Sequence, residues 1–459
     1  MKLATFSRFT IFQVACFVSV LSITSSCGKK NSGSTVITIN PQVTHQEMIG
    51  FGGSLAWYSD PIVNSRRRNE LCQLLFEDLG TDIIRLKSWY YPDNYPAYKD
   101  VEKMRDDNSL FQWYNTTQVY LAAKHYNPTI KILLTSWGPP EGLKSNANTR
   151  QGTLKSDANG FMYDAFAQYW VDLLDHAPFN PDYISIQNEP SYVNAGWTTC
   201  QFAPTETKSL AGYDKAFDKV YERIHVRSGA PVLIGPDVAT FGNVQNDVFS
   251  AYANVLKDKA SLGFLCYHLY SFTSSTSPEQ TIPPLEALRK YNKPNIMSEF
   301  SESFDWINTA LLINNTLTHA NTSAYLHWKL TWDTTPVGSG NQALISIDAN
   351  GNYTKTSFYY LIKHYAKYID AGYKRVEATS ANPSVNVSAF IDLSGKQVTS
   401  ILINTTNETI PDFQVEGYSI SKRKIFQSTE KELYKAINDA SPLSLPPRSV
   451  TTVVMDIER

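Results

Sequence analysis

The sequence predicts a (β/α)8 barrel that is packed against a smaller antiparallel β-sandwich. Eight short apolar runs alternate with longer stretches of helical pattern between residues 49 and 371, as in a closed barrel of parallel strands. The segment from 372 to 459 changes to short alternating strands broken by Asn, Gly and Pro, which is typical of an antiparallel sheet. The length of 459 residues, of which 42% are hydrophobic, allows both domains a core.

The apolar runs give the expected barrel strands in order. They are Ile49–Gly53, Ile83–Leu86, Ile130–Leu134, Tyr183–Ile186, Val232–Gly235, Leu262–Cys266, Asn295–Met297 and Ala324–Trp328. Helical patterns such as Tyr163–Leu174 and Tyr213–His225 separate them. The count of eight depends on the first run, which contains three glycines.

We expect the sandwich to be built from both ends of the chain, as residues 35–48 and 372–459, with the barrel at 49–371. Its strands are Lys374–Val376, Val385–Phe390, Thr399–Ile403 and Val450–Val454, and Val36–Ile39 joins them. Because the connection is short and no low-complexity segment intervenes, the two domains should be packed rather than tethered.

Residues 1–27 read as an export signal. Lys2 and Arg8 supply positive charge, and Phe9–Ile23 supplies an apolar stretch. The small residues before Cys27 resemble a bacterial lipoprotein signal, which predicts a lipid on Cys27, a tether at residues 28–34 and anchoring at the outer membrane. Ordinary secretion, with Cys27 uninvolved, is the alternative.

Charge and cysteine content exclude several other classes. A net charge of −2 gives no electrostatic footprint for nucleic acid, so we expect no nucleic-acid partner. We expect membrane contact only through the predicted lipid anchor. Cys72, Cys200 and Cys266 have neither metal-ligand spacing nor a disulfide framework, although one bridge is possible. No histidine cluster has ligand spacing either, so we expect no metal. We also expect no cofactor and a monomeric protein.

Two glutamates follow predicted strands. Glu189 ends the run that starts at Tyr183, and Pro190 prevents that strand from continuing; Glu299 follows Asn295–Met297. Residues at the carboxyl ends of barrel strands line the mouth at which barrel enzymes do their chemistry. Two carboxylates there suffice for glycoside hydrolysis, whereas the alternative is that either glutamate is a solvated loop charge.

Aromatic and polar residues at the other strand ends suit a sugar, since its flat faces stack on aromatic rings and its hydroxyls need donors. The predicted substrate-binding residues are Trp57, Arg85, Trp89, Trp137, Asn188, His268, Tyr270, Trp328 and Trp332. Some have other readings: Arg85 as a structural ion pair, His268 as a satisfied barrel histidine, and Trp328 as core.

The motifs at the strand ends resemble glycoside hydrolase family 30. They are Tyr183–Pro190, Leu134–Pro140 with Leu143–Asn146, Gly50–Gly53 and His364–Val376, and the similarity runs from about Val36 to the C-terminus. The resemblance implies that Glu189 is the acid/base and Glu299 the nucleophile, with Arg85, Asn188 and Tyr270 around them. Gly196–Phe202, Ile234–Pro236 and Tyr267–Tyr270 are most similar to the xylanase subfamilies, especially subfamily 7.

This resemblance implies a retaining endo-acting hydrolase of β-1,4-xylan. Cleavage of β-1,6-glucan or β-1,6-galactan, exo action on xylan, and a non-catalytic glycan-binding lipoprotein are the alternatives. The bacterial glucuronoxylanases of the family grip a glucuronate branch with an arginine and a tyrosine after the eighth strand, where this chain has Lys329–Pro336 and no arginine. Glu302 adds a carboxylate near Glu299, and we interpret it as a solvated loop residue.

Overall fold

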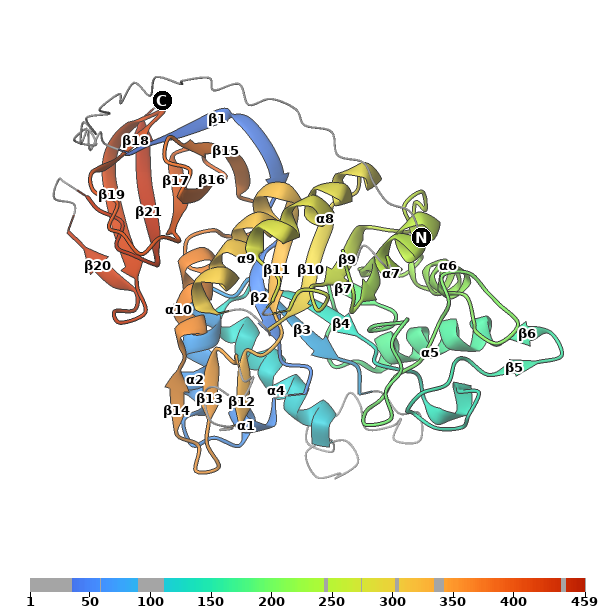
Figure 1. The fold of residues 1–459 in the computed structure, drawn as a ribbon. Helices are drawn as coiled ribbons and strands as arrows, with labels where there is room; N and C mark the ends of the chain where they lie inside the picture. The colour runs from blue at the N-terminus through green and yellow to red at the C-terminus, as the bar shows by residue number, and fades with distance from the viewer. Residues whose placement is uncertain are drawn as a thin grey trace, which may run out of the picture. The chain divides into compact units, whose positions relative to one another are not determined.

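The computed structural model of the chain is drawn in Figure 1. It describes residues 35–57, 59–89, 111–242, 247–273, 275–301, 305–333, 342–438 and 443–458. These residues belong to one compact unit that begins at Ser34. The predicted export signal with Cys27, the tether at 28–34 and Glu302 lie outside the described residues, so these expectations stay predictions.

Eight parallel strands close into a barrel, which confirms the predicted fold class. In chain order they are β2 (Gly50–Ser54), β3 (Ile83–Lys87), β4 (Lys131–Thr135), β7 (Tyr183–Ser185), β8 (Val232–Val238), β9 (Phe264–His268), β10 (Asn295–Phe300) and β11 (Thr322–His327). The glycines of β2 have a steric reason: a Cβ on Gly52 would lie 1.7 Å from the carbonyl oxygen of Ile83. The glycine-rich first run is therefore a true strand.

Helices and short turns surround the barrel (Figure 1). They are α1 (Asp60–Val63), α2 (Arg68–Gln73) with η1 (Leu74–Asp78), α4 (Phe111–Tyr126), η4 (Glu141–Leu143), α5 (Tyr163–His176), α6 (Tyr213–Ile224), α7 (Val248–Leu256), η5 (Pro278–Thr281), α8 (Ile282–Ala287) with η6 (Leu288–Tyr291), α9 (Trp306–His319) and α10 (Ser357–Ala366). Two of them have acidic N-caps, since Asp247 and Asp305 accept from backbone N–H groups of Ser250 and Asn308. None of the helices in the described ranges is long and apolar enough to cross a membrane.

The inside of the barrel is apolar in one layer and polar in the next. Seven fully buried side chains form the apolar layer: Ile83, Leu133, Ile234, Cys266, Ile296, Ala324 and Leu326. Further along the same strands, toward their carboxyl ends, buried polar side chains follow: Arg85, Thr135, Ser185, Asp237, His268 and Ser298. The apolar layer fills the barrel below a polar mouth, as in other barrels of this type.

An eight-stranded sheet forms the second domain. It is ordered β18-β1-β15-β16-β17-β21-β19-β20. Its strands are β1 (Thr35–Glu47), β15 (Lys374–Ser380), β16 (Val385–Ile391), β17 (Gln397–Asn404), β18 (Phe413–Glu416), β19 (Ser419–Ser428), β20 (Lys435–Ile437) and β21 (Ser449–Glu458). Both chain ends contribute, as predicted, and all neighbours are antiparallel except β1 and β18, which pair in parallel.

His364 joins this sheet to the barrel. Its ring on α10 contacts Oγ1 of Thr452 at 2.8 Å and Oγ of Ser428 at 2.7 Å, on β21 and β19. Burial, together with the charge of nearby Lys363, lowers the pKa of His364 to about 3, so the ring is neutral at pH 7. The contact agrees with packed rather than tethered domains.

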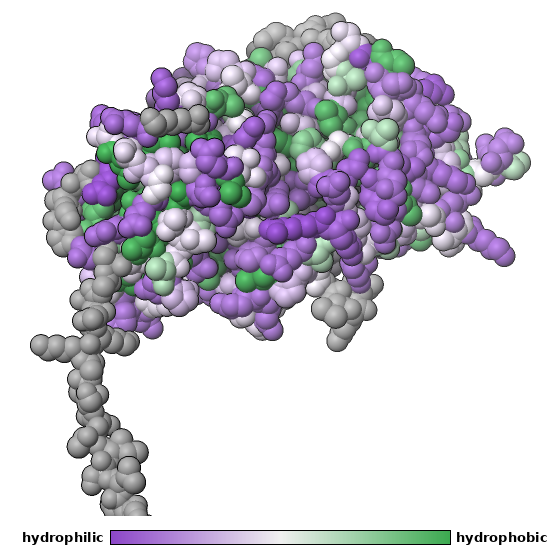
Figure 2. Space-filling view, turned by 90° about the horizontal axis from the view of Figure 1, so that it is seen from above, coloured by the Kyte–Doolittle hydropathy of each residue, from purple (hydrophilic) through white to green (hydrophobic). Residues whose placement is uncertain are grey.

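Short elements that the sequence did not predict complete the fold. β12 (Thr331–Asp333), β13 (Ile345–Ile347) and β14 (Tyr353–Lys355) form a small sheet, and β5 (Ser156–Asp157) pairs with β6 (Gly160–Phe161). On the face shown in Figure 2, hydrophilic residues dominate and hydrophobic ones are scattered among them, as on the surfaces of most soluble domains.

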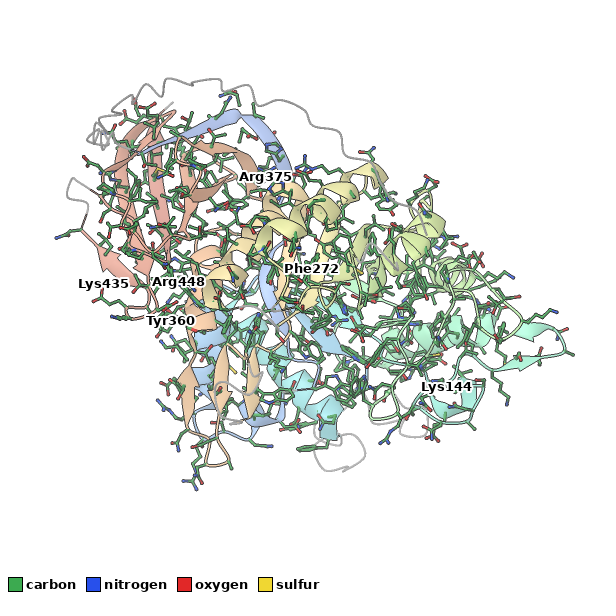
Figure 3. All side chains as sticks on the ribbon, in the orientation of Figure 1. Lys144, Phe272, Tyr360, Arg375, Lys435 and Arg448 are labelled. Carbon is green, nitrogen blue, oxygen red and sulfur yellow. The ribbon has the colours of Figure 1, made fainter. Side chains whose placement is uncertain are left out.

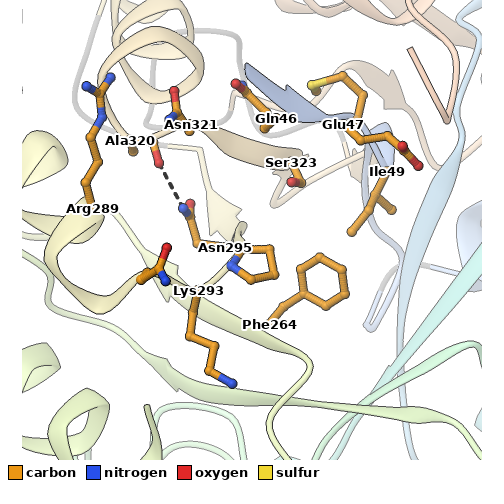
Figure 4. A pocket seen from close by; sticks show the side chains of 13 residues that line it. Gln46, Glu47, Ile49, Phe264, Arg289, Lys293, Asn295, Ala320, Asn321 and Ser323 are labelled. Atoms are coloured by element: carbon orange, nitrogen blue, oxygen red, sulfur yellow. Dashed lines mark hydrogen bonds between the residues drawn. The ribbon is translucent and has the colours of Figure 1, made fainter. Parts of the chain in front are cut away.

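A cavity of about 540 Å³ lies at the amino-terminal ends of β9, β10 and β11 (Figure 4). Two of its amide side chains donate to backbone carbonyls: Asn295 donates to Ala320 at 2.9 Å, and Gln46 donates to Leu317 at 2.8 Å and to Thr322 at 3.1 Å. The bonds of Gln46 tie the end of β1 to α9 and to the start of β11.

Candidate active site

Arg85 lies at the centre of the polar mouth and is fully buried. From β3, its guanidinium donates to Glu299, to Oδ1 of Asn188 at 2.6 Å and to Oδ2 of Asp237 at 2.8 Å, and its Nε donates to Thr135 at 3.2 Å. Burial opposes its charge, but Asp237 and Glu299 outweigh burial and raise the pKa of Arg85 above its ordinary value. Arg85 is therefore a permanent cation held in one geometry.

Asp237, at the end of β8, is the buried counter-charge of the site. It accepts from Arg85, from Ser185 Oγ at 2.7 Å and from Ser298 Oγ, and its Oδ1 lies 3.0 Å from Nε2 of His268. Burial raises the pKa of this carboxyl, but Arg85 and His268 outweigh burial and hold it below its ordinary value. Asp237 is therefore an anion with all its acceptor capacity engaged.

His268 bridges two carboxylates from a fully buried position on β9. Its Nδ1 lies 3.0 Å from Oε1 of Glu189, and its Nε2 contacts Asp237. Burial lowers its pKa, but the charge of Glu299 and the bonds to Asp237 and Glu189 more than offset this and raise the pKa to about 10. At neutral pH the ring is thus an imidazolium that donates from both nitrogens.

Glu189 occupies a sharp turn four residues after the end of β7. Its φ is +47°, a left-handed conformation that costs a non-glycine residue about 1–3 kcal/mol and is concentrated at functional sites. The turn is held from both sides, because the N–H of Glu189 donates to the Asp237 carbonyl at 2.8 Å and that of Asn188 donates to the Ser136 carbonyl at 2.7 Å. The backbone therefore fixes where the Glu189 carboxylate points.

Glu299, on β10, faces Glu189 across a short gap. Arg85 donates to its Oε2, and the hydroxyl of Tyr270 donates to its Oε1 at 2.9 Å. One oxygen of Glu189, one oxygen of Glu299 and a ring nitrogen of His268 all lie within 4.8 Å of one another. Burial raises the pKa of Glu299, while His268 and Arg85 oppose that shift.

The two glutamates open into a cavity of about 700 Å³. Its other lining residues are Trp57, Trp137, Asn188, Tyr192, Trp197, Ala239, Thr240, Tyr270, Trp328 and Trp332. Three indoles form a continuous wall, because the ring centroid of Trp137 is 5.9 Å from that of Trp57 and 6.0 Å from that of Trp328. A cavity with aromatic walls and two facing carboxylates suits a sugar.

Six of the nine predicted substrate-binding residues line this cavity, namely Trp57, Trp137, Asn188, Tyr270, Trp328 and Trp332. The other three are not part of its lining, and their contact with a substrate stays a prediction. Arg85 and His268 are fully buried beneath the carboxylates. Trp89 packs edge-on against Trp57, with centroids 5.1 Å apart and an interplanar angle of 88°.

Sequence reasoning missed several residues of the site. Tyr192 and Trp197, in the loop after β7, line the cavity with 41% and 43% of their surfaces exposed, and their rings stack with centroids 6.3 Å apart. The signal that could have revealed this pair is that both aromatic residues follow Glu189 closely in the sequence. Lys87 was also missed: it is 2% exposed, and its ammonium lies 3.5 Å from the ring centroid of Trp57 and 3.6 Å from that of Trp89.

Glu189, His268 and Glu299 are also close enough together to hold a metal, and they are the group with this spacing in the described part of the chain. The donor chemistry does not fit, because both ring nitrogens of His268 already contact carboxylate oxygens and its raised pKa keeps the ring protonated. A protonated imidazole has no lone pair for a metal.

Comparisons with known proteins identify a similar sequence and similar folds. No family model matches the sequence. Glucuronoxylanase XynC of Bacillus subtilis (strain 168) is 22% identical over 464 residues, which cover 96% of this chain and 97% of that protein.

Solved structures show the same fold. The family 30 subfamily 8 xylanase Xyn30A from Clostridium acetobutylicum has a TM-score of 0.66 at 22% identity, and the catalytic domain of the family 30 xylanase C from Talaromyces cellulolyticus has 0.70 at 18%. Each match covers 92% of this chain and 99% of the other. The endo-β-1,6-glucanase BT3312 has a TM-score of 0.69 at 16% identity, with coverages of 92% and 94%.

The particular similarity to subfamily 7 stays a prediction. The similarity to XynC along almost the whole chain and the shared fold nevertheless confirm that this chain resembles glycoside hydrolase family 30.

Proposed function

We propose that this chain is a retaining glycoside hydrolase that cleaves β-1,4-xylan within the polymer. The observation that carries the proposal is the pair Glu189 and Glu299 at an aromatic-walled cavity, where one carboxylate oxygen of each lies within 4.8 Å of the other. Retaining glycosidases hold their two carboxyl groups about 5–5.5 Å apart, whereas inverting ones need about 6.5–9.5 Å to admit a water molecule. The short gap favours retention.

In the proposed reaction, an ionised Glu299 attacks the anomeric carbon while protonated Glu189 gives its proton to the departing glycosidic oxygen. The bond to that oxygen breaks, and a covalent glycosyl ester with Glu299 forms. Glu189, now a carboxylate, takes a proton from water as the water attacks the same carbon and releases Glu299. The anomeric configuration is inverted twice and thus retained.

Neighbouring groups fit these roles. Arg85 and Tyr270 both donate to Glu299, which stabilises the anion that must attack. Arg85 also holds the amide oxygen of Asn188, so the amide nitrogen is the group with which Asn188 can donate to a sugar hydroxyl. His268 fixes the carboxylate of Glu189 from behind.

The relatives support xylan as the substrate, because one is a glucuronoxylanase and two of the structural neighbours are xylanases. A β-1,6-glucanase of the same fold keeps β-1,6-glucan as the second candidate, and β-1,6-galactan and exo action on xylan fall under the same test. We further propose that no glucuronate branch is required. At Lys329, the ammonium lies 4.5 Å from the ring centroid of Trp332 and offers a point charge rather than an arginine fork.

A panel of purified β-glycans with sizing of the products tests substrate and mode of action. We expect mixed short oligosaccharides from linear xylan and from glucuronoxylan alike. Release of single sugars only would indicate exo action. Turnover of β-1,6-glucan alone would mean that β-1,6-glucan, and not xylan, is the substrate. Binding of xylan without release of reducing sugar would instead indicate a glycan-binding protein that is not an enzyme.

The mechanism is tested by following the anomer of the first product by NMR. We expect the β-anomer to form first, and an initial α-anomer would exclude double displacement. Glu299→Gln and Glu189→Gln should each abolish cleavage of xylan. Glu302→Gln is the matched control and should cleave xylan like the wild type.

We also propose that the chain is exported and lipidated on Cys27. Labelled fatty acid should enter the wild-type protein in a bacterial host, and Cys27→Ser should abolish the label. A labelled Cys27→Ser protein would exclude this cysteine as the site, and an unlabelled wild type would favour ordinary secretion.

A further inference from the structure

Lys144 is a buried cation outside the network described above. It follows the short turn η4 in the loop after β4, is 1% exposed, and is labelled among the loops in Figure 3. Its ammonium contacts three backbone carbonyl oxygens, those of Gln151 and Thr199 and, at 3.4 Å, that of Thr149. Within the described part of the chain, no carboxylate forms an ion pair with it. Three carbonyl dipoles thus take the place of a counter-ion.

The carbonyls belong to two different loops. Thr149 and Gln151 lie in the loop after β4, and Thr199 lies in the loop after β7. An ammonium has three N–H donors, so one lysine can hold all three oxygens at once. Lys144 therefore fastens one active-site loop to the other.

Further hydrogen bonds follow the same seam. The N–H of Gln151 donates to Oγ1 of Thr199 at 2.9 Å, and the N–H of Gln201 donates to the Gly152 carbonyl at 2.8 Å. Arg150 reaches the Ala195 carbonyl at 3.2 Å. The carbonyl groups that converge at this seam need hydrogen-bond donors, since carbonyl oxygens left unpaired in the interior are unfavourable, and the Lys144 ammonium supplies such donors.

The loop that Lys144 fastens carries part of the cavity wall. Tyr192 and Trp197 stand on it between Glu189 and Thr199, and both line the cavity. In the proposed function Glu189 protonates the leaving oxygen. An aromatic pair in the same loop, shortly after Glu189, therefore faces the part of the glycan that departs.

We propose that Lys144 is a positioning residue whose ammonium holds the Tyr192–Trp197 pair in place as a stacking wall for the leaving part of the glycan chain. This inference rests on the proposed function. It implies that loss of the ammonium weakens binding of glycans that extend past the cleaved bond. Small substrates whose leaving group is a simple phenol do not reach this wall and should be little affected.

Lys144→Met, which keeps the alkyl stem, tests the proposal against Lys155→Met, a matched change at an exposed lysine further along the same loop. For Lys144→Met we expect KM on xylo-oligosaccharides to rise about 3- to 10-fold, the equivalent of one lost stacking contact. Both KM and kcat on an aryl xylobioside should stay within about twofold of the wild type, by the same free-energy conversion. Lys155→Met should change neither. An equal rise in KM on both substrates would overturn the proposal.

A double-mutant cycle with Trp197→Ala separates positioning from general damage. If Lys144 acts through Trp197, adding Lys144→Met to Trp197→Ala should raise KM no further, whereas independent effects would multiply. Multiplied effects would overturn the proposal. If Lys144→Met does not fold, Lys144→Gln, which keeps two N–H donors without the charge, takes its place in the same cycle.

Amide hydrogen exchange of residues 194–201 gives a readout that needs no substrate. Exchange should become faster in Lys144→Met and stay at the wild-type rate in Lys155→Met. Unchanged exchange in Lys144→Met would overturn the proposed positioning role of Lys144, even if the enzyme is active. If the wild type cleaves no glycan but exchange is faster in Lys144→Met, the proposed function is refuted and the positioning role of Lys144 still holds.

Discussion

Nε2 of His268 lies 3.0 Å from Oδ1 of Asp237, and through this contact one buried carboxylate serves both glutamates of the site. His268 reaches Glu189 with its other nitrogen, while Arg85 links Asp237 to Glu299. Asp237 thus holds the two cations that orient the two carboxylates. This shared anion is a buried hub whose loss should disturb both.

Asp237→Asn should therefore lower both stability and activity. The substitution keeps the size of the side chain but leaves Arg85 and His268 without their shared counter-charge. Breaking a buried ion pair in this way typically costs about 3–5 kcal/mol. Denaturant unfolding should show a loss of this order, and kcat on xylan should fall strongly.

Asp258→Asn is the control, because Asp258 is paired with Lys257 at the surface and its side chain is 84% exposed. Such pairs contribute about 0–1 kcal/mol, so little change is expected. If Asp237→Asn unfolded at the wild-type midpoint with wild-type kcat, Asp237 would not be the hub.

The charge on His268 predicts a pH dependence of stability. Its pKa is about 10 in the folded protein and 6.5 in the unfolded chain, so the folded state binds the extra proton. The contribution is fully present below pH 6.5 and is lost as the pH rises toward 10, by at most about 1.4 kcal/mol per pH unit.

His268→Gln should remove this component. Unfolding free energies measured from pH 6 to 10 should decline less steeply for His268→Gln than for the wild type. His319→Gln, at a partly exposed histidine paired with Glu286, is the control and should follow the wild type. Parallel curves for His268→Gln and the wild type would show that His268 is neutral in the folded protein.

The barrel could be predicted from the sequence because its strands are apolar and its acids stand where strands end. That pattern singles out Glu189 and Glu299 as candidates, and their predicted roles rest on the resemblance to family 30. Asp237 stands at the same kind of position, yet its carboxylate points into the barrel and not into the cavity. A sequence shows where a strand ends, but not which way the next side chain turns.

Long-range contacts explain the other differences. The parallel pairing of β1 with β18 joins segments far apart in the chain, and no local pattern encodes such a partner. Trp89 and Trp57 are equivalent as sequence signals, and only packing makes Trp57, and not Trp89, part of the cavity lining. Tyr192 and Trp197 stand in a loop whose course depends on the contacts of Lys144.

Lys87→Met should stabilise the protein. Burial lowers the pKa of Lys87 well below its ordinary value, so the desolvation of its ammonium outweighs the attraction of the Trp57 and Trp89 rings. Methionine fills similar space without a charge to desolvate, and a gain of about 1 kcal/mol in unfolding free energy is expected at pH 7.

The gain should shrink as the pH rises. A lysine with a lowered pKa destabilises the folded state where the unfolded chain is protonated, so the penalty fades toward pH 10.5. Lys155→Met, at the exposed lysine, should show no gain. A loss of stability in Lys87→Met would mean that the ammonium contributes more through the two rings than its burial costs.

Tyr270→Phe should impair the nucleophile while leaving the fold intact. The Tyr270 hydroxyl donates to Oε1 of Glu299 at 2.9 Å, and a hydrogen bond to a charged group contributes about 1.5–3 kcal/mol. Without it the anion is less stable, so the pKa of Glu299, already raised by burial, should rise further. Because the attacking form is the anion, the acid limb of kcat/KM should move to higher pH by about one unit.

Tyr291→Phe is the matched control, since it removes a hydroxyl that contacts Ser250 far from the cavity. Its pH profile should coincide with that of the wild type. The measurement is kcat/KM on an aryl xylobioside between pH 4 and 8, where a good leaving group reduces the need for acid assistance. An unmoved acid limb in Tyr270→Phe would mean that Arg85 and His268 alone keep Glu299 ionised, and the hydroxyl would then serve the sugar instead.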